Sequence, residues 1–138
     1  MTPPGRSRRS RRGPETAGAA MREPPSIDAY GGGGFRVSGA WRPGSLLLLD
    51  DQAFDWRPRT IEDLTVEDFE AVFAAGPAAS EFVLLGTGAA QALPPRTVRE
   101  AIRAAGLGLE FMSTDAAART YGVMMSEGRR CAVALIAI

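Results

Sequence analysis

The sequence predicts an α/β fold, with a layered core around a mostly parallel β-sheet and β-hairpin material added before it. From residue 81 to the end, the hydrophobic patterning alternates strand, helix, strand, helix and strand, as in parallel α/β cores. Before that point, short apolar stretches are separated by glycine-containing turns. The length of 138 residues and the 45% share of hydrophobic residues indicate one domain with a sizeable core.

The first half of the chain predicts short strands and tight turns. The four glycines at 31–34 predict a flexible turn, because glycine adopts backbone angles that other residues rarely reach. The unbroken apolar run at 45–49 predicts a strand covered on both faces. The expected elements are, in order, a strand at 27–30, a half-exposed strand at 35–37, a tight turn at 41–44, the buried strand at 45–49 and its hairpin partner at 53–56.

Capping residues and helical spacing mark three helices in the second half. Thr65 and Asp68 resemble a capping box, and Gly76-Pro77 stops the helix that follows. Pro95 suits the first turn of the second helix, and Thr114 is expected to cap the third. The expected elements are a helix from 66 to Gly76-Pro77, a strand at 81–85, a helix at 95–105, a strand at 109–112, a helix at 115–126 and a strand at 131–138.

Charge is unevenly distributed along the chain. Residues 1–20 contain five arginines and one glutamate, whereas the remaining residues contain eleven arginines and fifteen acidic residues, a net charge of −4. The foldable part is therefore mildly acidic, which argues against nucleic-acid binding. Residues 1–25 are expected to be a disordered basic tail, an arginine-rich organelle-targeting segment or a misassigned start with Met21 as the initiator. Residues 26–138 are expected to form the single domain.

Absent residue types limit the chemistry of the chain. The lack of His and Lys excludes an imidazole base, His metal ligands, a Schiff-base lysine and a Walker lysine. Cys131, the only cysteine, lies in an apolar run and is expected to be a buried, unreactive thiol. Asp50-Asp51 and Glu67-Asp68 each lack a third oxygen ligand, so no metal site and no cofactor are expected. No apolar run reaches the length of a membrane span, and we expect a cytoplasmic protein.

Several short sequence motifs occur in the same order as in one known family. They are Tyr30-Gly-Gly-Gly-Gly-Phe35-Arg36, Gly44-Ser45-Leu-Leu-Leu-Leu49, Leu84-Leu85-Gly86-Thr87-Gly88, Met112-Ser113-Thr114-Asp115-Ala116-Ala117, Arg119-Thr120-Tyr121 and Glu127-Gly128-Arg129-Arg130. Over about residues 26–138, the chain resembles the small domain family of mitochondrial NADH:ubiquinone oxidoreductase (complex I) assembly factor three. That family also includes the adipogenesis-associated MTH-domain protein and many uncharacterised bacterial and archaeal proteins.

The resemblance implies a three-layer α/β fold around a mixed sheet in which one strand runs antiparallel to the others. It also implies a role in respiratory complex I biogenesis and a protein partner such as a respiratory-complex subunit. Many family members read Thr-Tyr-Asn where this chain reads Thr120-Tyr121-Gly122. Any role of that asparagine amide is therefore absent here.

The candidate ligand-binding residues lie mainly on two loops that follow predicted strands. Ligands of α/β proteins often bind beyond the carboxyl ends of the strands. If the strands are neighbours, the two loops frame one pocket, in which an arginine would hold an anionic group. The alternative interpretation is structural, with a turn, a helix cap and a surface ion pair. The residues concerned are Gly86, Thr87, Gly88, Ser113, Thr114, Arg119 and Tyr121.

The leading hypothesis is a non-catalytic, chaperone-like binding or assembly-factor protein, motivated by the resemblance and by the missing catalytic side chains. One alternative is an enzyme or small-molecule sensor that uses carboxylate, Tyr, Ser and Arg chemistry at the two loops. A second alternative is a structural subunit that forms a homo-oligomer through its C-terminal strand.

Overall fold

The computed structural model describes residues 22–138, and the expectations for residues 1–21 lie outside this part. Within it, Arg22 to Pro25 precede the first strand and contact the domain. The elements are β1 (Ile27–Gly31), β2 (Gly34–Val37), β3 (Ala40–Pro43), β4 (Ser45–Leu49), β5 (Gln52–Trp56), η2 (Ile61–Asp63), η3 (Val66–Phe69), α1 (Glu70–Ala79), β6 (Phe82–Gly86), α2 (Arg96–Ala104), β7 (Gly108–Met112), α3 (Thr114–Ser126) and β8 (Cys131–Leu135).

The central sheet has five strands in the order β5-β4-β8-β6-β7. β8, β6 and β7 are parallel, whereas β4 pairs antiparallel with both of its neighbours. β4 is therefore the one strand that runs against the others, and the mixed sheet that the resemblance implies is confirmed. β8 lies in the middle with both of its edges hydrogen-bonded. The C-terminal strand thus has no free edge through which another copy of the chain would pair.

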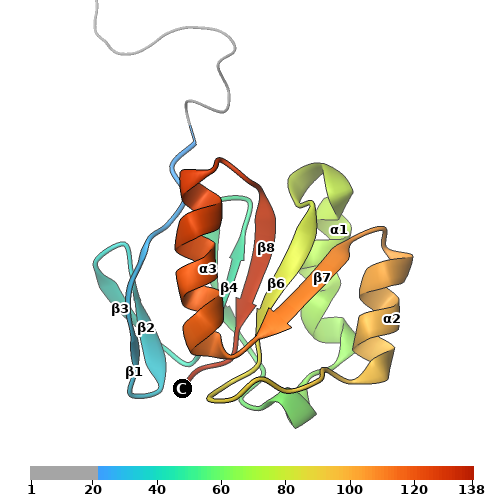
Figure 1. The fold of residues 1–138 in the computed structure, drawn as a ribbon, viewed down its shortest axis with the longest axis horizontal. Helices are drawn as coiled ribbons and strands as arrows, with labels where there is room; N and C mark the ends of the chain where they lie inside the picture. The colour runs from blue at the N-terminus through green and yellow to red at the C-terminus, as the bar shows by residue number, and fades with distance from the viewer. Residues whose placement is uncertain (1–21) are drawn as a thin grey trace, which may run out of the picture.

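The domain has three layers, with a separate core on each face of the central sheet (Figure 1). α3 and the small sheet β1-β2-β3 cover one face, while α1 and α2 cover the other (Figure 1). Side chains of β4 alternate between the two cores: Leu46 and Leu48 face α3, whereas Leu47 and Leu49 face α1 and α2. All five residues of β4 are buried, so the strand predicted to be covered on both faces is confirmed.

The small sheet contains a strand at a position where the sequence predicts a turn. The expected turn at 41–44 is wrong, because Ala40–Pro43 form β3, which pairs antiparallel with β2. The chain reverses one step earlier, at Ser38 and Gly39, where both residues have positive φ. Pro43 has no backbone N–H, but β3 lies at the edge of its sheet, where not every N–H has to bond to a neighbouring strand. Proline therefore marks the strand's end here and not a turn.

The first helix differs from the expected one at both ends. It begins with the 3₁₀ turn η3 before continuing as α1. Gly76 breaks it with φ 73 and ψ −179, and Pro77 then starts a further turn that reaches Ala79. Gly76-Pro77 is thus a break and not the end, because proline suits the first turn of a new helical segment. α2 and α3 lie where the sequence predicts helices.

Candidate functional site

The two predicted loops meet at the carboxyl end of the sheet, because β6 and β7 are adjacent and parallel. Thr87 donates its backbone N–H to the Met112 carbonyl over 2.8 Å. Thr114 donates its backbone N–H to the Gly88 carbonyl, also over 2.8 Å. The structure therefore brings the loop at 86–88 together with Ser113 and Thr114.

Thr114 lies at the centre of this junction, and it is completely buried. Its hydroxyl accepts the Gly88 N–H over 3.0 Å and donates to the Ile136 carbonyl over 2.7 Å. A Cβ added at Gly86 would approach the Thr114 Cα to 2.9 Å, so this close contact requires glycine. Because a buried group that loses its partner destabilises the fold, these contacts give Thr114 a structural role.

The other two hydroxyl groups in the loops also bond within the protein. Thr87, only 4% exposed, donates to the Ala90 carbonyl and accepts the Ala92 N–H. Ser113 accepts the Ala116 N–H over 3.3 Å, so Ser113 is the N-cap of α3. The expected capping by Thr114 is wrong by one residue, since its hydroxyl is turned toward the core. Ligand binding at these loops stays a prediction.

Arg119 and Tyr121 make their hydrogen bonds elsewhere. Arg119 pairs with Asp115, one helical turn earlier, and the same carboxylate accepts the hydroxyl of Tyr30. Hydrogen bonds from Tyr30 and Arg119 lower the pKa of Asp115. The Tyr121 hydroxyl donates to the Pro25 carbonyl. Among the described residues, neither Arg119 nor Tyr121 hydrogen-bonds to the two loops, and the surface ion pair considered for Arg119 is what the structure shows.

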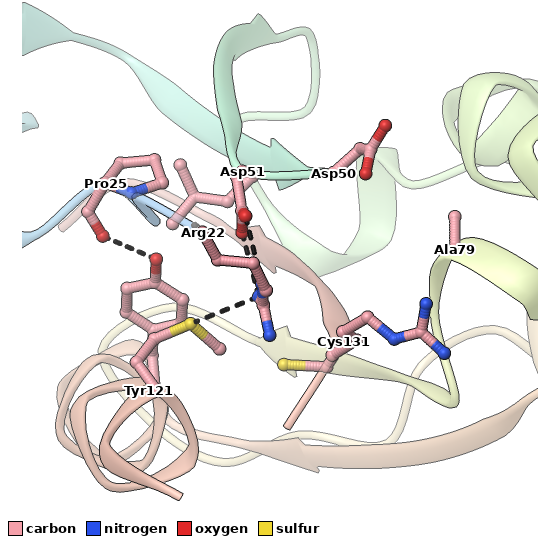
Figure 2. A pocket seen from close by; sticks show the side chains of 10 residues that line it. Arg22, Pro25, Asp50, Asp51, Ala79, Tyr121 and Cys131 are labelled. Atoms are coloured by element: carbon pink, nitrogen blue, oxygen red, sulfur yellow. Dashed lines mark hydrogen bonds and ion pairs between the residues drawn. The ribbon is translucent and has the colours of Figure 1, made fainter. Parts of the chain in front are cut away.

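A cavity lies where the N-terminal strap, defined as residues 22–26, crosses the start of β8 and the second half of α3 (Figure 2). Of the seven predicted site residues, only Tyr121 lines it. The lining residues are Arg22, Pro25, Leu48, Asp50, Asp51, Ala79, Tyr121, Met125, Arg130 and Cys131. The sequence carries no local signal for this cavity, because residues that are separated by up to about a hundred positions form it only after folding.

Arg22 covers the cavity and forms a bidentate ion pair with Asp51. Its Nε and Nη2 donate to the two carboxylate oxygens of Asp51 over 3.0 and 2.8 Å. Its Nη1 donates to the carbonyls of Gly128 and Arg129, which follow α3. The hydrogen bond with Asp51 raises the pKa of the Arg22 guanidinium. The two side chains are 21% and 24% exposed, so the pair is partly shielded from water.

The Asp51 carboxylate is presented by an unusual turn. Asp50 and Asp51 form the two-residue connection between β4 and β5, with φ 53 and φ 62. Hairpin turns of this left-handed type normally use Asn-Gly or Asp-Gly, because a side chain at the second position is disfavoured there. Asp51 is nevertheless placed in this conformation, with its carboxylate on Arg22.

The two titratable side chains deeper in the cavity are held neutral. Burial raises the pKa of the Tyr121 phenol, and it raises the pKa of the Cys131 thiol to about 11. Cys131 is 9% exposed, so the expected buried thiol is confirmed. A neutral thiol is a poor nucleophile, since the thiolate is the reactive form.

Two further observations concern metals and membranes. In the part of the chain from Arg22 to Ile138, no group of three or more Cys, Asp or Glu side chains is arranged to hold a metal ion. None of the helices described there is both long and apolar enough to cross a membrane.

The three-layer fold and the shared loop phrases define a class of small α/β domain, and comparison with known proteins identifies it. Residues 27–136 match the model of the family described as "Protein of unknown function (DUF498/DUF598)", and the chain belongs to this family. It is 38% identical over 110 residues to an uncharacterised protein of Rhodobacter capsulatus, covering 80% of this chain and 82% of that protein.

Two other relatives carry more informative names. The chain is 33% identical over 111 residues to bovine NADH dehydrogenase [ubiquinone] 1 alpha subcomplex assembly factor 3, which covers 80% of this chain but only 59% of the bovine protein. The resemblance to the complex I assembly-factor family is thereby confirmed. A "13 kDa major membrane protein" of Francisella tularensis is 29% identical over 93 residues, covering 66% of this chain and 73% of the relative. The cytoplasmic location therefore stays a prediction.

Solved structures share the fold. A Rhodopseudomonas palustris protein is 41% identical with a TM-score of 0.71, covering 82% of this chain and 83% of that one. A Bordetella pertussis protein described as a Mth938-like domain is 28% identical with a TM-score of 0.70, covering 92% of both chains.

Proposed function

We propose that this protein is a non-catalytic binding factor that holds a protein partner during the assembly of a respiratory complex. The observation that carries the proposal is the 33% identity to the bovine assembly factor over most of this chain. The match covers 111 residues, which are 80% of this chain and 59% of the bovine protein. The specific partner we propose is a subunit of the peripheral arm of a proton-translocating NADH dehydrogenase.

The chemistry of the described residues supports binding over catalysis. The cavity contains a neutral thiol and a neutral phenol, and burial raises the pKa of both Cys131 and Tyr121. A general base or an activated nucleophile needs its pKa shifted toward the working pH, which is the opposite direction for these two groups. The hydroxyls of Thr87 and Thr114 are already engaged in internal hydrogen bonds.

Deletion of the gene in the organism that encodes it tests the proposal. The amount of assembled NADH dehydrogenase is measured on native gels, together with free peripheral-arm subunits. We expect less assembled complex in the deletion strain, an accumulation of free subunits, and restoration by the full-length gene. A deletion strain with a normal amount of assembled complex would contradict the proposed role.

A second candidate function is anion or small-molecule binding beside the loop at 86–88. It is favoured by one observation, namely that the structure brings this loop together with Ser113 and Thr114. A thermal-shift screen against phosphates, nucleotides and organic acids tests it. A rise in melting temperature with at least one of these compounds would support this function, and no shift with any of them would contradict it.

A further inference from the structure

We propose that the N-terminal strap is a lid that opens locally over the cavity beside Cys131 and is held shut by the ion pair between Arg22 and Asp51. The lid's opening is a property of the chain alone. Its use in controlling access to the surface of α3 rests on the proposed binding function.

The strap is attached by few hydrogen bonds. Pro24 and Pro25 have no N–H, so two of its five residues cannot donate to a neighbouring strand. Its described backbone contacts are concentrated at Pro25, which accepts the Tyr121 hydroxyl, and at Ser26, which exchanges bonds with Ser38. Segments with few backbone bonds and little apolar burial open at low free-energy cost. At its far end, the strap is held by the side chain of Arg22.

The strap borders a hollow that is open to solvent. This hollow, of about 270 Å³, lies between the strap and α3, and the cavity around Arg22 is much smaller, at about 20 Å³. Gly122, an exposed residue in the middle of α3, borders this hollow. A segment that borders an open hollow has few packing contacts to lose when it moves. The residues around the hollow are Pro24, Pro25, Ser26, Ile27, Ala118, Tyr121, Gly122 and Met125.

The position of Cys131 makes the opening measurable. Cys131 lines the same cavity as Arg22 (Figure 2), and the residue as a whole is 9% exposed. Cys131 is also the only cysteine in the chain, so a thiol reagent forms a single adduct. The rate of alkylation by N-ethylmaleimide, followed by mass spectrometry of the full chain, therefore reports how often the strap leaves the cavity.

We expect Arg22→Gln and Asp51→Asn each to accelerate the alkylation of Cys131 by about tenfold, because each removes a charged hydrogen-bonded pair that holds only the closed form. The double variant should react no faster than the single variants, since they lose the same interaction. The Arg22 charge lowers the pKa of the thiol. Its loss would by itself slow the reaction, so an acceleration reports exposure and not a more acidic thiol.

Two controls separate local opening from other causes. Asp50→Asn removes a carboxylate from the same turn that has no hydrogen bond or ion pair within residues 22–138, and it should leave the rate unchanged. Asp68→Ala destabilises the whole fold away from the strap and should also leave the rate unchanged. Wild-type rates in Arg22→Gln and Asp51→Asn would overturn the proposal. Equal acceleration in Asp68→Ala would overturn it too, because the thiol would then react through global unfolding.

The two proposals fail separately. If alkylation shows that the strap opens, but deletion of the gene leaves respiratory-complex assembly normal, the lid proposal stands and the assembly role is wrong. If deletion of the gene impairs assembly, but the alkylation rate of Cys131 in the purified protein does not depend on Arg22, the assembly role stands and the lid proposal is wrong.

Discussion

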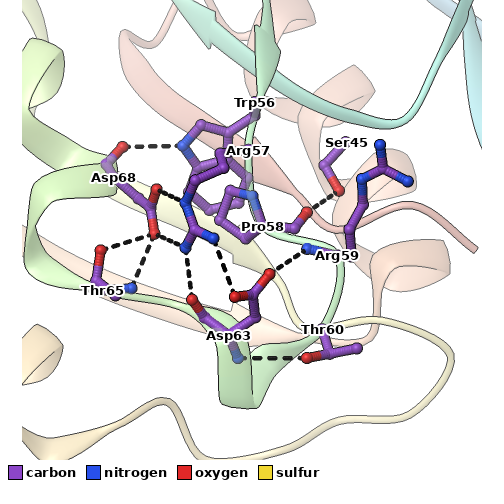
Figure 3. Close-up of polar contacts among 9 residues, drawn as sticks. All are labelled: Ser45, Trp56, Arg57, Pro58, Arg59, Thr60, Asp63, Thr65 and Asp68. Atoms are coloured by element: carbon purple, nitrogen blue, oxygen red, sulfur yellow. Dashed lines mark hydrogen bonds and ion pairs between the residues drawn. The ribbon is translucent and has the colours of Figure 1, made fainter.

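Two arginines, Arg57 and Arg22, each bind an aspartate through two guanidinium N–H groups, but they lie in regions that are packed differently. Arg57 binds both Asp68 oxygens over 2.8 and 2.7 Å and also binds Asp63 over 2.9 Å (Figure 3). These partners lie 6 and 11 residues away in the sequence. Arg22 binds Asp51 from 29 residues away and carbonyls from more than a hundred residues away.

The two networks also differ in what lies beneath them. Next to Arg57, Trp56 donates its indole N–H to the Asp68 carbonyl over 2.9 Å and packs edge-on against Phe69. Both rings belong to the core on the α1 and α2 face. Beneath Arg22 is a cavity. The same kind of ion pair thus lies over a packed core in one region and over a cavity in the other. Its loss should therefore lower the stability of the whole fold in the first region and cause only local opening in the second.

The largest effect that we expect comes from Asp68→Ala. The Asp68 carboxylate accepts the Thr65 N–H and hydroxyl in addition to Arg57, and its side chain is only 6% exposed. Removing it leaves the start of η3 without its cap and breaks the bidentate pair with Arg57. The free energy of unfolding in urea should fall by about 2 kcal/mol.

Glu67→Ala is the matched control for this variant. Glu67 is an exposed carboxylate on the same turn, and its replacement should change the free energy of unfolding by less than about 0.5 kcal/mol. If the two variants lost equal stability, the effect would come from removing negative charge at the helix start and not from the network.

The pH dependence of stability should reveal the same network. Burial alone would raise the pKa of the Asp68 carboxyl, but hydrogen bonds from Arg57 and Thr65 outweigh it and hold that pKa below its usual value. A lowered folded-state pKa means that the stabilisation is complete above the unfolded pKa of about 3.9 and is lost as the pH falls through the folded value.

Urea unfolding of the wild type and Asp68→Asn between about pH 6 and pH 3 measures this effect. The wild type should be more stable near pH 6, and the difference should shrink toward the acidic end as its carboxylate is protonated. A constant difference over that range would show that the charge of Asp68 contributes nothing and that packing alone explains the loss.

Most of the fold was predictable because its signals are local. Period-two and helical spacing located the strands and helices of the central layers, and the run at 45–49 correctly indicated burial on both faces. The errors occurred where two local signals compete. Proline and glycine at 43 and 44 favoured a turn, but β3 pairs with β2 and reverses at Ser38-Gly39 instead. An edge strand tolerates proline, and only the pairing decides.

The candidate site was predictable only in part, for the same physical reason. Parallel neighbouring strands place their following loops together, so the meeting of residues 86–88 with Ser113 and Thr114 followed from the alternation of strands and helices. The sequence did not predict which hydroxyl caps α3, because Ser113 and Thr114 are both able to do so. The cavity near Arg22 depended on contacts across the length of the chain, for which the sequence carries no local signal.

The smallest effect is an interaction free energy, measured by double-variant cycles in urea. Arg22→Gln and Asp68→Ala share no partner, so their losses of stability should add within about 0.5 kcal/mol. Arg22→Gln and Asp51→Asn remove one interaction and should be non-additive by about 1 kcal/mol. Strong coupling between Arg22 and Asp68 would mean that the strap and η3 unfold as one cooperative unit. In that case, Arg22 would brace the fold as Arg57 does, and the strap would not open as a separate lid.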